Sequence, residues 1–293
     1  MSQPRISAFA SLANGNAQPT RAIQGPKTLQ ARTSHYIAVD SVHDELVVPN
    51  PFAQAILFFR GGATGNEAPI RFIQGPKTLL NAVDNVAVDA VHREIMTASF
   101  PTDSILVFRS EAGGDVEPIR ILHGPKTQLD RPIRVEVDPV NNLMAVMTDH
   151  ALLVFNRSDS GDAAPKWIIS GPKTGIGTRY GTRDLKLFPE GKKIIAGASI
   201  RAPRATGQRV ARSAESNGEE DEGFFRGGGQ RFIGVWKYGD NGDVAPWAAL
   251  NATPITKIPG SRLALNPEGG DLVIGGDGQV SVYHLPEIFQ RVD

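Results

Sequence analysis

The stretch ILFFRGGATGNEAPIRFIQGPKT (Ile56–Thr78) occurs several times, with substitutions, in this 293-residue chain. Close copies are ILVFRSEAGGDVEPIRILHGPKT (Ile105–Thr127) and LLVFNRSDSGDAAPKWIISGPKT (Leu152–Thr174). Residues 6–28 form a further copy, and residues 233–254 form a degenerate copy without GPKT. The GPKT glycines are residues 25, 75, 124 and 171, so the repeat is about 50 residues long.

A second block follows each of these copies and has the pattern of a strand, a tight turn and a strand. Two examples are YIAVDSVHDELVVPN (Tyr36–Asn50) and NVAVDAVHREIMTAS (Asn85–Ser99), and three more start at residues 134, 184 and 262. Aliphatic and β-branched residues stand on both sides of a polar or glycine-containing turn. The two blocks together predict four short strands per repeat, which in the second repeat are residues 86–89, 94–99, 105–108 and 118–122.

Four short antiparallel strands in about 50 residues are typical of one blade of a β-propeller. We therefore predict an all-β chain that forms a single propeller domain over residues 1–293, with a β-solenoid or β-sandwich as the alternative. The five inner-strand blocks favour five four-stranded blades, and six blades remain an alternative. The C-terminal repeat ends after three strands. We expect the N-terminal strand at residues 19–23 to join that blade and close the ring, which leaves residues 6–9 as a surplus strand.

The repeats resemble those of NHL-type propellers, whose pattern is a GIAVD strand, a turn, an IYVAD strand and an I.VF strand. The resemblance covers nearly the whole chain and implies the propeller fold. It does not select one function, because NHL-like propellers serve as scaffolds, lyases and lactonases. The family pattern usually has glycine directly before the IAVD strand, and this chain has polar or aromatic residues there instead.

The composition excludes several classes of function. Lysine plus arginine equals aspartate plus glutamate at 31 each, so there is no electrostatic case for a nucleic-acid or anionic-membrane partner. No apolar run approaches the length of a membrane span and no signal peptide is visible, so we expect a soluble chain. The absence of cysteine excludes disulfides, cysteine-ligated zinc and thiol nucleophiles. Compartment and oligomeric state stay open.

The GPKT tetrapeptide is not a phosphate-binding loop. Such a loop has glycine directly before the lysine, and here proline removes a backbone N–H that would face a phosphate. A strand follows, whereas a phosphate site needs a helix N-terminus. We interpret GPKT as the linker between blades, whose lysines form at most a positive rim. These lysines are Lys27, Lys77, Lys126 and Lys173.

The predicted strand order assigns the loops to two faces. The linker face carries the GPKT linkers, the residues just before each inner strand and the loops between second and third strands. The opposite, turn face carries the SVHDE-type turns and the connections such as residues 61–69. We interpret His43 and His92 as residues of those turns.

Polar side chains gather on the linker face around the predicted central channel, which indicates a pocket for a small or peptide-like ligand. The arginines favour an anionic ligand. The alternative is a channel lined by salt bridges, such as Glu136 with Lys186. The candidate ligand-binding residues are Tyr36, Asn85, Arg134, Glu136, Arg183, Lys186 and Arg262.

Four further residues on this face have the chemistry of a general acid or base, and they are His35, Asp84, His150 and Asp184. A divalent cation such as calcium is a candidate cofactor, since the resemblance extends to calcium-dependent lactonases. Their full ligand set has no match here, so no metal ligands are assigned and no cofactor is established.

The fourth repeat contains an insertion at about residues 200–230, basic at first and then acidic. Its composition predicts a flexible loop, either a lid, a partner-binding segment or a solvated insertion. Three functional hypotheses follow. The first is a ligand-binding propeller, the second is a hydrolase, lyase or cyclase that uses the histidines and aspartates, and the third is a structural interaction domain. No serine-hydrolase motif is present.

Overall fold

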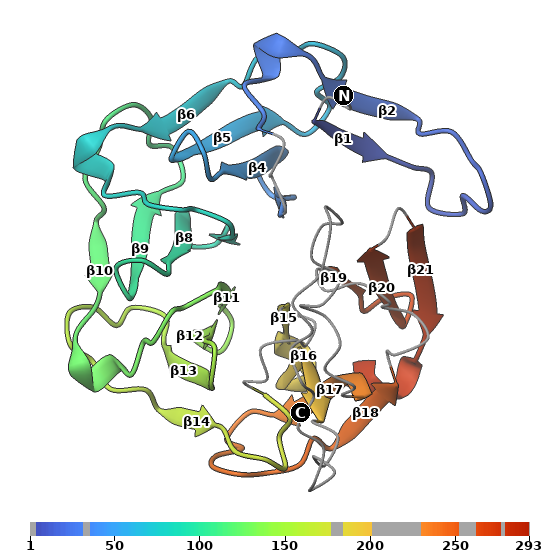
Figure 1. Cartoon of the computed structure of the whole chain (residues 1–293). Helices are drawn as coiled ribbons and strands as arrows, with labels where there is room; N and C mark the ends of the chain where they lie inside the picture. Colours follow the sequence, from blue (N-terminus) through green and yellow to red (C-terminus); the bar gives the residue numbers. More distant parts are fainter. Residues whose placement is uncertain are drawn as a thin grey trace, which may run out of the picture. The chain divides into compact units, whose positions relative to one another are not determined.

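The computed structural model describes residues 4–31, 36–176, 184–200, 230–251, 262–276 and 279–292. These residues form a five-blade β-propeller of antiparallel sheets, which confirms the predicted fold class (Figure 1). The helices in this part of the chain are 3-10 helices of three or four residues. The chain divides into two compact units, residues 1–168 and 169–293. Most of the predicted insertion, residues 201–229, lies outside the described residues.

The first unit contains an N-terminal hairpin and blades 1 to 3. The hairpin consists of β1 (Arg5–Ala8) and β2 (Arg21–Gln24). Blade 1 contains β3 (Ala38–Asp40), β4 (Glu45–Asn50), β5 (Ala55–Arg60) and β6 (Arg71–Gln74). Blade 2 contains β7 (Val86–Asp89), β8 (Glu94–Ser99), β9 (Ser104–Arg109) and β10 (Arg120–Leu122). Blade 3 contains β11 (Arg134–Asp138), β12 (Leu143–Met147), β13 (Leu152–Asn156) and β14 (Trp167–Ile169), whose last residue belongs to the second unit.

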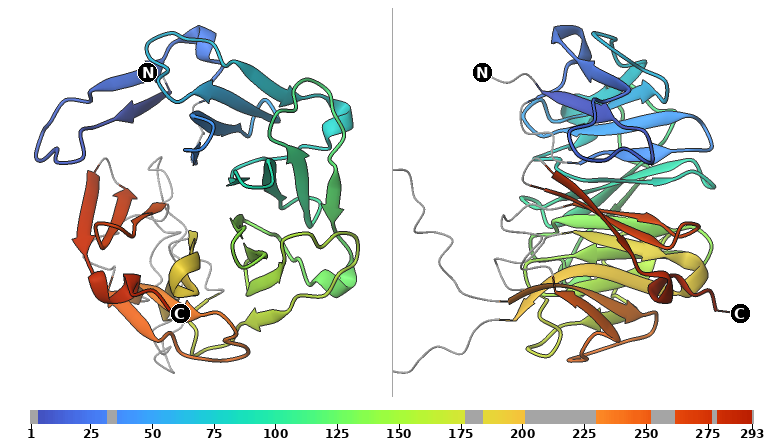
Figure 2. Two further views of the ribbon diagram at one scale, coloured as in Figure 1. Left: turned by 180° about the vertical axis from the view of Figure 1, so that it is seen from behind. Right: turned by 90° about the vertical axis from the view of Figure 1, so that its right-hand side faces the viewer.

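The second unit contains blades 4 and 5, and Figure 2 gives two further views of the sheets. Blade 4 contains β15 (Leu185–Phe188), β16 (Lys193–Ile200), β17 (Gln230–Lys237) and β18 (Ala248–Asn251). Blade 5 contributes β19 (Arg262–Asn266), β20 (Asp271–Gly276) and β21 (Gln279–His284). The 3-10 helix η4 (Pro189–Gly191) forms the turn after β15, and η6 (Pro286–Phe289) follows β21.

The N-terminal hairpin differs from the expected arrangement. The strand predicted to be surplus is β1, and it pairs with β2 in a two-stranded antiparallel sheet, with Ile6 opposite Ile23. The sheet of blade 5 contains β19, β20 and β21 among the described residues. Closure of this blade by the N-terminal strand therefore stays a prediction, as does the single domain over residues 1–293.

The hydrophobic cores lie between neighbouring blades, because alternate side chains of each strand point to opposite faces of its sheet. Val47 and Phe58 of blade 1 pack with Val86 and Phe108 of blade 2, and all four side chains are fully buried. Separate clusters join blade 2 to blade 3 and blade 4 to blade 5. Blades 1 and 2 are thus buried on both faces, which explains the nearly continuous apolar second and third strands of these two blades.

Each GPKT linker is a short turn. One hydrogen bond within the linker and one hydrogen bond to the next blade hold it in place. In the second linker, η2 (Pro76–Thr78), the buried Thr78 hydroxyl donates to the Gly75 carbonyl oxygen at 2.6 Å. The backbone N–H of Lys77 donates to Asp115 Oδ1 at 2.7 Å. A parallel bridge between Ile73 and Gly114 continues the contact along β6. We call this joint, made of the linker and the Gly-Asn or Gly-Asp pair of the next blade, the Gly–Asx clasp.

The clasp occurs at all four GPKT linkers. The backbone N–H of the linker lysine donates to the Asx side chain at 2.6–2.8 Å in each, in the pairs Lys27–Asn66, Lys77–Asp115, Lys126–Asp162 and Lys173–Asp243. The lysine side chains are exposed. GPKT is therefore an inter-blade linker, as predicted.

One expectation about the faces was right for the start of each connection and wrong for its middle. The connections between third and fourth strands were assigned to the turn face, opposite the linkers, yet Asn66 and Asp115 bond directly to linker residues. The connection of each blade extends along the outer strand of the preceding blade, as the parallel bridge of Gly65 with Ile23 shows. Its middle therefore reaches the linker.

The turns between first and second strands are stabilised by aspartate side chains. Asp40 accepts hydrogen bonds from the backbone N–H of Val42 and His43, and its Oδ2 lies 2.8 Å from His43 Nδ1. Asp89 lies in the same way against His92, with 2.9 Å between Oδ2 and Nδ1. Both histidines are turn residues, as predicted.

Across the described ranges, no helix has both the length and the apolar character that a membrane span requires.

Candidate functional site at the inner ends of the first three blades

The first unit brings five of the predicted site residues together at the beginnings of β3, β7 and β11, which are neighbouring inner strands. Arg134, at the start of β11, is the centre of this group and is 4% exposed. Its Nη1 donates to Asp84 Oδ2 at 3.1 Å and to the Ile133 carbonyl oxygen at 2.6 Å. The Arg134 guanidinium carbon also lies 5.7 Å from the centre of the Tyr36 ring. An arginine from blade 3 thus contacts residues of blades 1 and 2.

Tyr36 links the first blade to the third. Its ring is buried in the core between blades 1 and 2, and its hydroxyl donates to Glu136 Oε1 at 2.5 Å. Glu136 lies on β11, two residues after Arg134, so both side chains point to the same face of the strand. We call Tyr36, Asp84, Asn85, Arg134 and Glu136 the inner-end cluster.

Asn85 has a structural role that the sequence did not predict. It is 1% exposed, and its Oδ1 accepts a hydrogen bond of 2.7 Å from the backbone N–H of Val135 in the next blade. That bond fixes the orientation of the amide. The Nδ2 group is fully buried, and within the described part of the chain it has no hydrogen-bond acceptor. A buried donor of this kind is rare in folded proteins and is a feature that needs a physical explanation.

The equivalent residue of blade 4 is Asp184, in the second unit. It is fully buried, and its Oδ2 accepts a hydrogen bond of 2.5 Å from the backbone N–H of Leu263 at the start of blade 5. Its Oδ1 accepts from the N–H of Leu185. Asp184 therefore joins two blades in the way that Asn85 does. Lys186 on β15 and Arg262 on β19 belong to the same unit and are partly exposed.

The remaining candidates are placed elsewhere or lie outside the described residues. His150 lies in the loop after β12, with its Nε2 3.6 Å from Asp130 Oδ2, and both side chains are largely exposed. The neighbouring Asp149 pairs with Arg131. His35 and Arg183 lie outside the described residues. The sequence therefore predicted which residues belong to the inner-end cluster. It did not predict which of them form an ion pair and which form hydrogen bonds to the backbone of the next blade.

Metal binding was expected only as an alternative. In the ranges that the structure describes, no three side chains of His, Asp or Glu are arranged to hold a metal ion. Calcium stays a candidate cofactor without an assigned site.

A buried ion network that the sequence analysis did not identify lies between blades 2 and 3. Glu94 accepts two hydrogen bonds of 2.7 Å from Arg120 and one of 2.7 Å from Arg157. Burial acts to raise the pKa of the Glu94 carboxyl. The hydrogen bond and charge of Arg120, with the charge of Arg157, outweigh burial and hold that pKa below its usual value. Blade 1 has a simpler counterpart, in which Glu45 accepts two hydrogen bonds of 2.6 Å from Arg71.

Comparison with known proteins identifies the fold but no family. No protein-family model and no curated protein matches the chain. Among solved structures, a functionally unknown protein from Desulfotomaculum acetoxidans is similar over 99% of this chain and 75% of its own, with 12% identity and a TM-score of 0.56. A putative 6-phosphogluconolactonase from Bacteroides uniformis is similar over 91% of this chain and 69% of its own, with 15% identity and a TM-score of 0.54.

Hydrazine synthase of Kuenenia stuttgartiensis is also similar, with 12% identity and a TM-score of 0.51 over 84% of this chain. This chain spans 56% of the length of that protein. At such low identities the similarity shows the propeller fold alone, and propellers of this kind have unrelated functions.

Proposed function

We propose that the chain is a ligand-binding β-propeller whose inner-end cluster takes a small or peptide-like ligand through an anionic group, most simply a carboxylate. The observation that carries the proposal is the buried Nδ2 donor of Asn85, which has no acceptor among the described residues. A carboxylate oxygen of a ligand would be its missing partner. The NHL-type assignment of the repeats, which rests on the IAVD-like strand pattern, belongs to this proposal.

The position of Arg134 supports an anionic ligand. Asn85 Oδ1 bonds to the residue after Arg134, and Arg134 bonds to the residue before Asn85, so both residues lie at the junction of the same two inner strands. The carboxylate of Asp84 is 33% exposed, whereas Arg134 is buried. Asp84 is thus the partner that turns toward solvent when a ligand carboxylate replaces it on the guanidinium. Charge-assisted bonds of this type are among the stronger ones in proteins.

The two carboxylates of the cluster favour a peptide-like ligand. Asp84 and Glu136 are partly exposed and are hydrogen-bond acceptors. The C-terminal end of a peptide has a carboxylate and nearby N–H groups. Its carboxylate matches the donors Asn85 and Arg134, and its N–H groups match the two acceptor carboxylates. The hydrolase, lyase or cyclase alternative has no such specific observation, because His150 pairs with Asp130 in an exposed loop.

The test is binding of short peptides with free or amidated C-termini, measured by calorimetry after a thermal-shift screen of a tripeptide panel. We expect saturable binding of free peptides and at least a tenfold weaker binding of the amidated forms. A hydrogen bond to a charged group contributes about 1.5–3 kcal/mol, which corresponds to about 10-fold or more in affinity. Equal binding of both forms would exclude the proposed carboxylate contact.

The substitution Asn85→Asp separates binding from folding. Aspartate keeps the acceptor for the Val135 N–H, as Asp184 does for Leu263, but removes the Nδ2 donor and adds a negative charge. We expect loss of peptide binding at temperatures where the variant is still folded, and a lower melting temperature, because the second oxygen of the new carboxylate is buried without a donor. Asp184→Asn, the reverse change in the second unit, is the matched control and should leave binding within about twofold. Unchanged affinity in Asn85→Asp would refute the role of this amide.

A further inference from the structure

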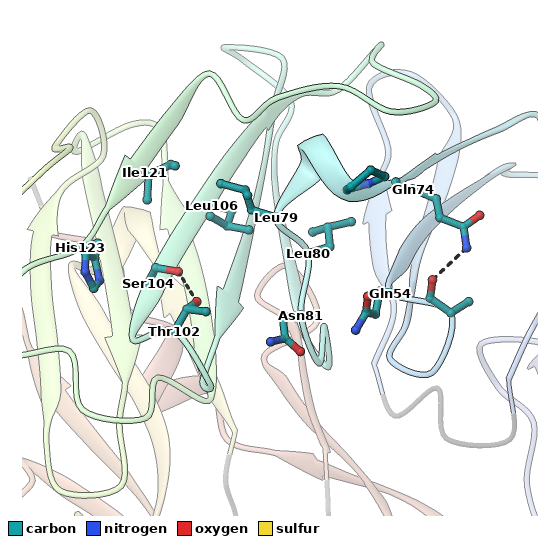
Figure 3. A pocket seen from close by; sticks show the side chains of 13 residues that line it. Gln54, Gln74, Leu79, Leu80, Asn81, Thr102, Ser104, Leu106, Ile121 and His123 are labelled. Carbon is teal, nitrogen blue, oxygen red and sulfur yellow. Dashed lines mark hydrogen bonds between the residues drawn. The ribbon is translucent and has the colours of Figure 1, made fainter.

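The first unit contains a pocket that shares no residue with the inner-end cluster. It has a volume of about 720 Å³ and lies between blades 1 and 2, beside the linker Gly75–Thr78 (Figure 3). That volume is within the range of about 300–1,000 Å³ typical of ligand sites. Its walls come from the β4–β5 turn, the end of β6 and the linker, the β8–β9 turn with β9, and β10.

The pocket is apolar at depth and polar at its mouth. Leu80, Ser104 and Leu106 are buried, and Ile121 is partly buried beside them. Gln54 and His123 are exposed on opposite walls. Figure 3 shows the leucines between these two polar side chains. A ligand would therefore bury an apolar group and keep its polar groups at the mouth.

The described lining residues are uncharged. Among the described residues that line this pocket there is no Asp, Glu, Lys or Arg, and His123 is the one titratable group of this set. Its Nδ1 lies 3.2 Å from the Asp103 carbonyl oxygen, which can only accept a hydrogen bond, so this nitrogen is the donor. The Nε2 atom is then an acceptor in the neutral ring. An ionised ligand would lose its hydration here without a compensating charge, so the pocket favours a neutral ligand.

Two amide side chains at the mouth are available to a ligand. Within the described part of the chain, the side chains of Gln54 and Asn81 make no hydrogen bond, whereas Gln74 Nε2 donates to the Ala53 carbonyl oxygen at 2.9 Å. A side-chain amide offers one donor group and one acceptor, which is the complement of a peptide group. The lining residues that the structure describes include no Phe, Tyr or Trp on which a sugar ring would stack. These features favour a peptide over a carbohydrate.

Leu79 forms part of the pocket wall. Its φ of 56° lies in the left-handed region, and its side chain is 53% exposed. The equivalent residue of the fourth linker is Gly175, which adopts this conformation without strain. Leu29 of the first linker shares the conformation of Leu79, so the backbone alone does not identify a site. Leu79 differs from it in lining the pocket, where an exposed leucine gains a partner when an apolar ligand group enters.

We propose that this pocket binds an extended, uncharged peptide segment that inserts one aliphatic side chain between Leu79, Leu80 and Leu106. The amides of Gln54 and Asn81 bond to peptide groups on either side of the inserted residue. This site is independent of the proposed carboxylate site, because the two share no residue and recognise different chemistry.

The experiment is selection of a phage-displayed library of random heptapeptides against the purified chain, followed by titration of synthetic peptides capped at both ends. We expect enrichment of one aliphatic position and depletion of charged residues. Ala53→Trp, an exposed wall position, fills the mouth and should weaken binding at least tenfold. Leu79→Gly relieves the left-handed strain, so it should fold normally and still weaken binding.

Two controls make the outcome decisive. Leu29→Gly is the matched change at the first linker and should leave affinity within about twofold, and so should Asn85→Asp in the inner-end cluster. Recovery of no peptide, recovery of charged peptides, or equal binding to the chain and to Ala53→Trp would overturn the proposal. Capped peptides that lose affinity only in Asn85→Asp would assign the binding to the inner-end cluster instead and would also overturn it.

Discussion

The Asp115 side chain and the backbone N–H of Lys77 are 38 residues apart in the chain and are joined by a hydrogen bond of 2.7 Å across two blades. The bond places the carboxylate directly against the Cα of Gly75, where an added Cβ would overlap the Asp115 side chain. The clasp therefore needs two residue types in two different repeats, an Asx that accepts and a glycine that leaves room.

We expect Gly75→Ala to destabilise the chain by about 2–4 kcal/mol, because it combines a steric overlap with a φ of +136°. Gly114→Ala is the matched control in the same joint. Gly114 has a φ of +74°, but an added Cβ would meet no atom within 4 Å, so the cost should be about 1–2 kcal/mol from the left-handed backbone alone. Chemical denaturation measures both, and equal losses would contradict the overlap.

Asp115→Ala should cost about 1–2 kcal/mol, because the Lys77 N–H loses its acceptor. Asp115→Asn should be nearly neutral, since Asn66 makes the same bond to Lys27 at 2.8 Å in the first joint. Thermal unfolding distinguishes the two. A loss of similar size in both variants would mean that the charge of Asp115, and not its hydrogen bond, stabilises the joint.

Glu94→Gln should destabilise the chain by about 3–5 kcal/mol, because it leaves Arg120 and Arg157 without the carboxylate between them. Glu45→Gln is the control with a single arginine partner and should cost less, about 1–2 kcal/mol. Denaturant titrations at pH 7 measure both changes. Equal losses would contradict the role of the second arginine.

The same carboxyl predicts an acid dependence of stability. Because the pKa of Glu94 is lowered in the folded chain, the unfolded chain takes up the proton first, at a pH of about 4.3. The stabilisation by Glu94 is therefore complete above that pH and is lost as the pH falls through the folded-state pKa. The free energy of unfolding, measured from pH 7 to pH 2.5, should fall less steeply in Glu94→Gln. Parallel curves would contradict this assignment.

Lys193→Met should loosen the C-terminal segment. Lys193 Nζ donates to the carbonyl oxygens of Ile288 and Gln290 at 2.9 and 3.1 Å, and it lies 5.0 Å from the centre of the Trp247 ring. Burial and then the charge of Lys237 lower the pKa of this ammonium group. Methionine keeps the packing but leaves both carbonyls unpaired, so amides of residues 287–292 should exchange at least several-fold faster with deuterium.

Lys237→Met is the control for that exchange experiment. Lys237 also lies over the Trp247 ring, at 5.6 Å, but it is exposed. Its substitution should leave the exchange of the C-terminal segment unchanged. Faster exchange in both variants would attribute the effect to the aromatic contact and not to the two carbonyl bonds.

The strands were predictable because the repeat displays them several times over. The copies differ from one another at many positions, but apolar residues recur at equivalent strand positions, such as Ile56 and Ile105. The turns between the strands keep glycine or Asx. The role of GPKT as a linker followed from Pro76, which cannot donate a hydrogen bond to a phosphate. Local chemistry was sufficient for these conclusions.

The joints were not predictable in the same way, because they connect atoms from different repeats. Gly-Asn or Gly-Asp recurs in every copy, for example at Gly114–Asp115, and this was the available signal for the clasp. The sequence alone does not show that the third-to-fourth-strand connection reaches the preceding linker. Asn85 and Asp184 were placed correctly before inner strands, but their bonds to Val135 and Leu263 depend on how far the next strand stands from them.

The Gly–Asx clasp also bears on how such a chain grows. The linker glycine of the joint ends one repeat, and the Asx acceptor lies in the middle of the next repeat. Every complete copy therefore carries an acceptor for the linker before it and a glycine that makes room for the Asx of the copy after it. A tandem duplication of one unit would create a new, fully matched joint at once, without any further substitution. The joint itself therefore sets no limit on how many units follow one another, because the same residue types close each of the four joints.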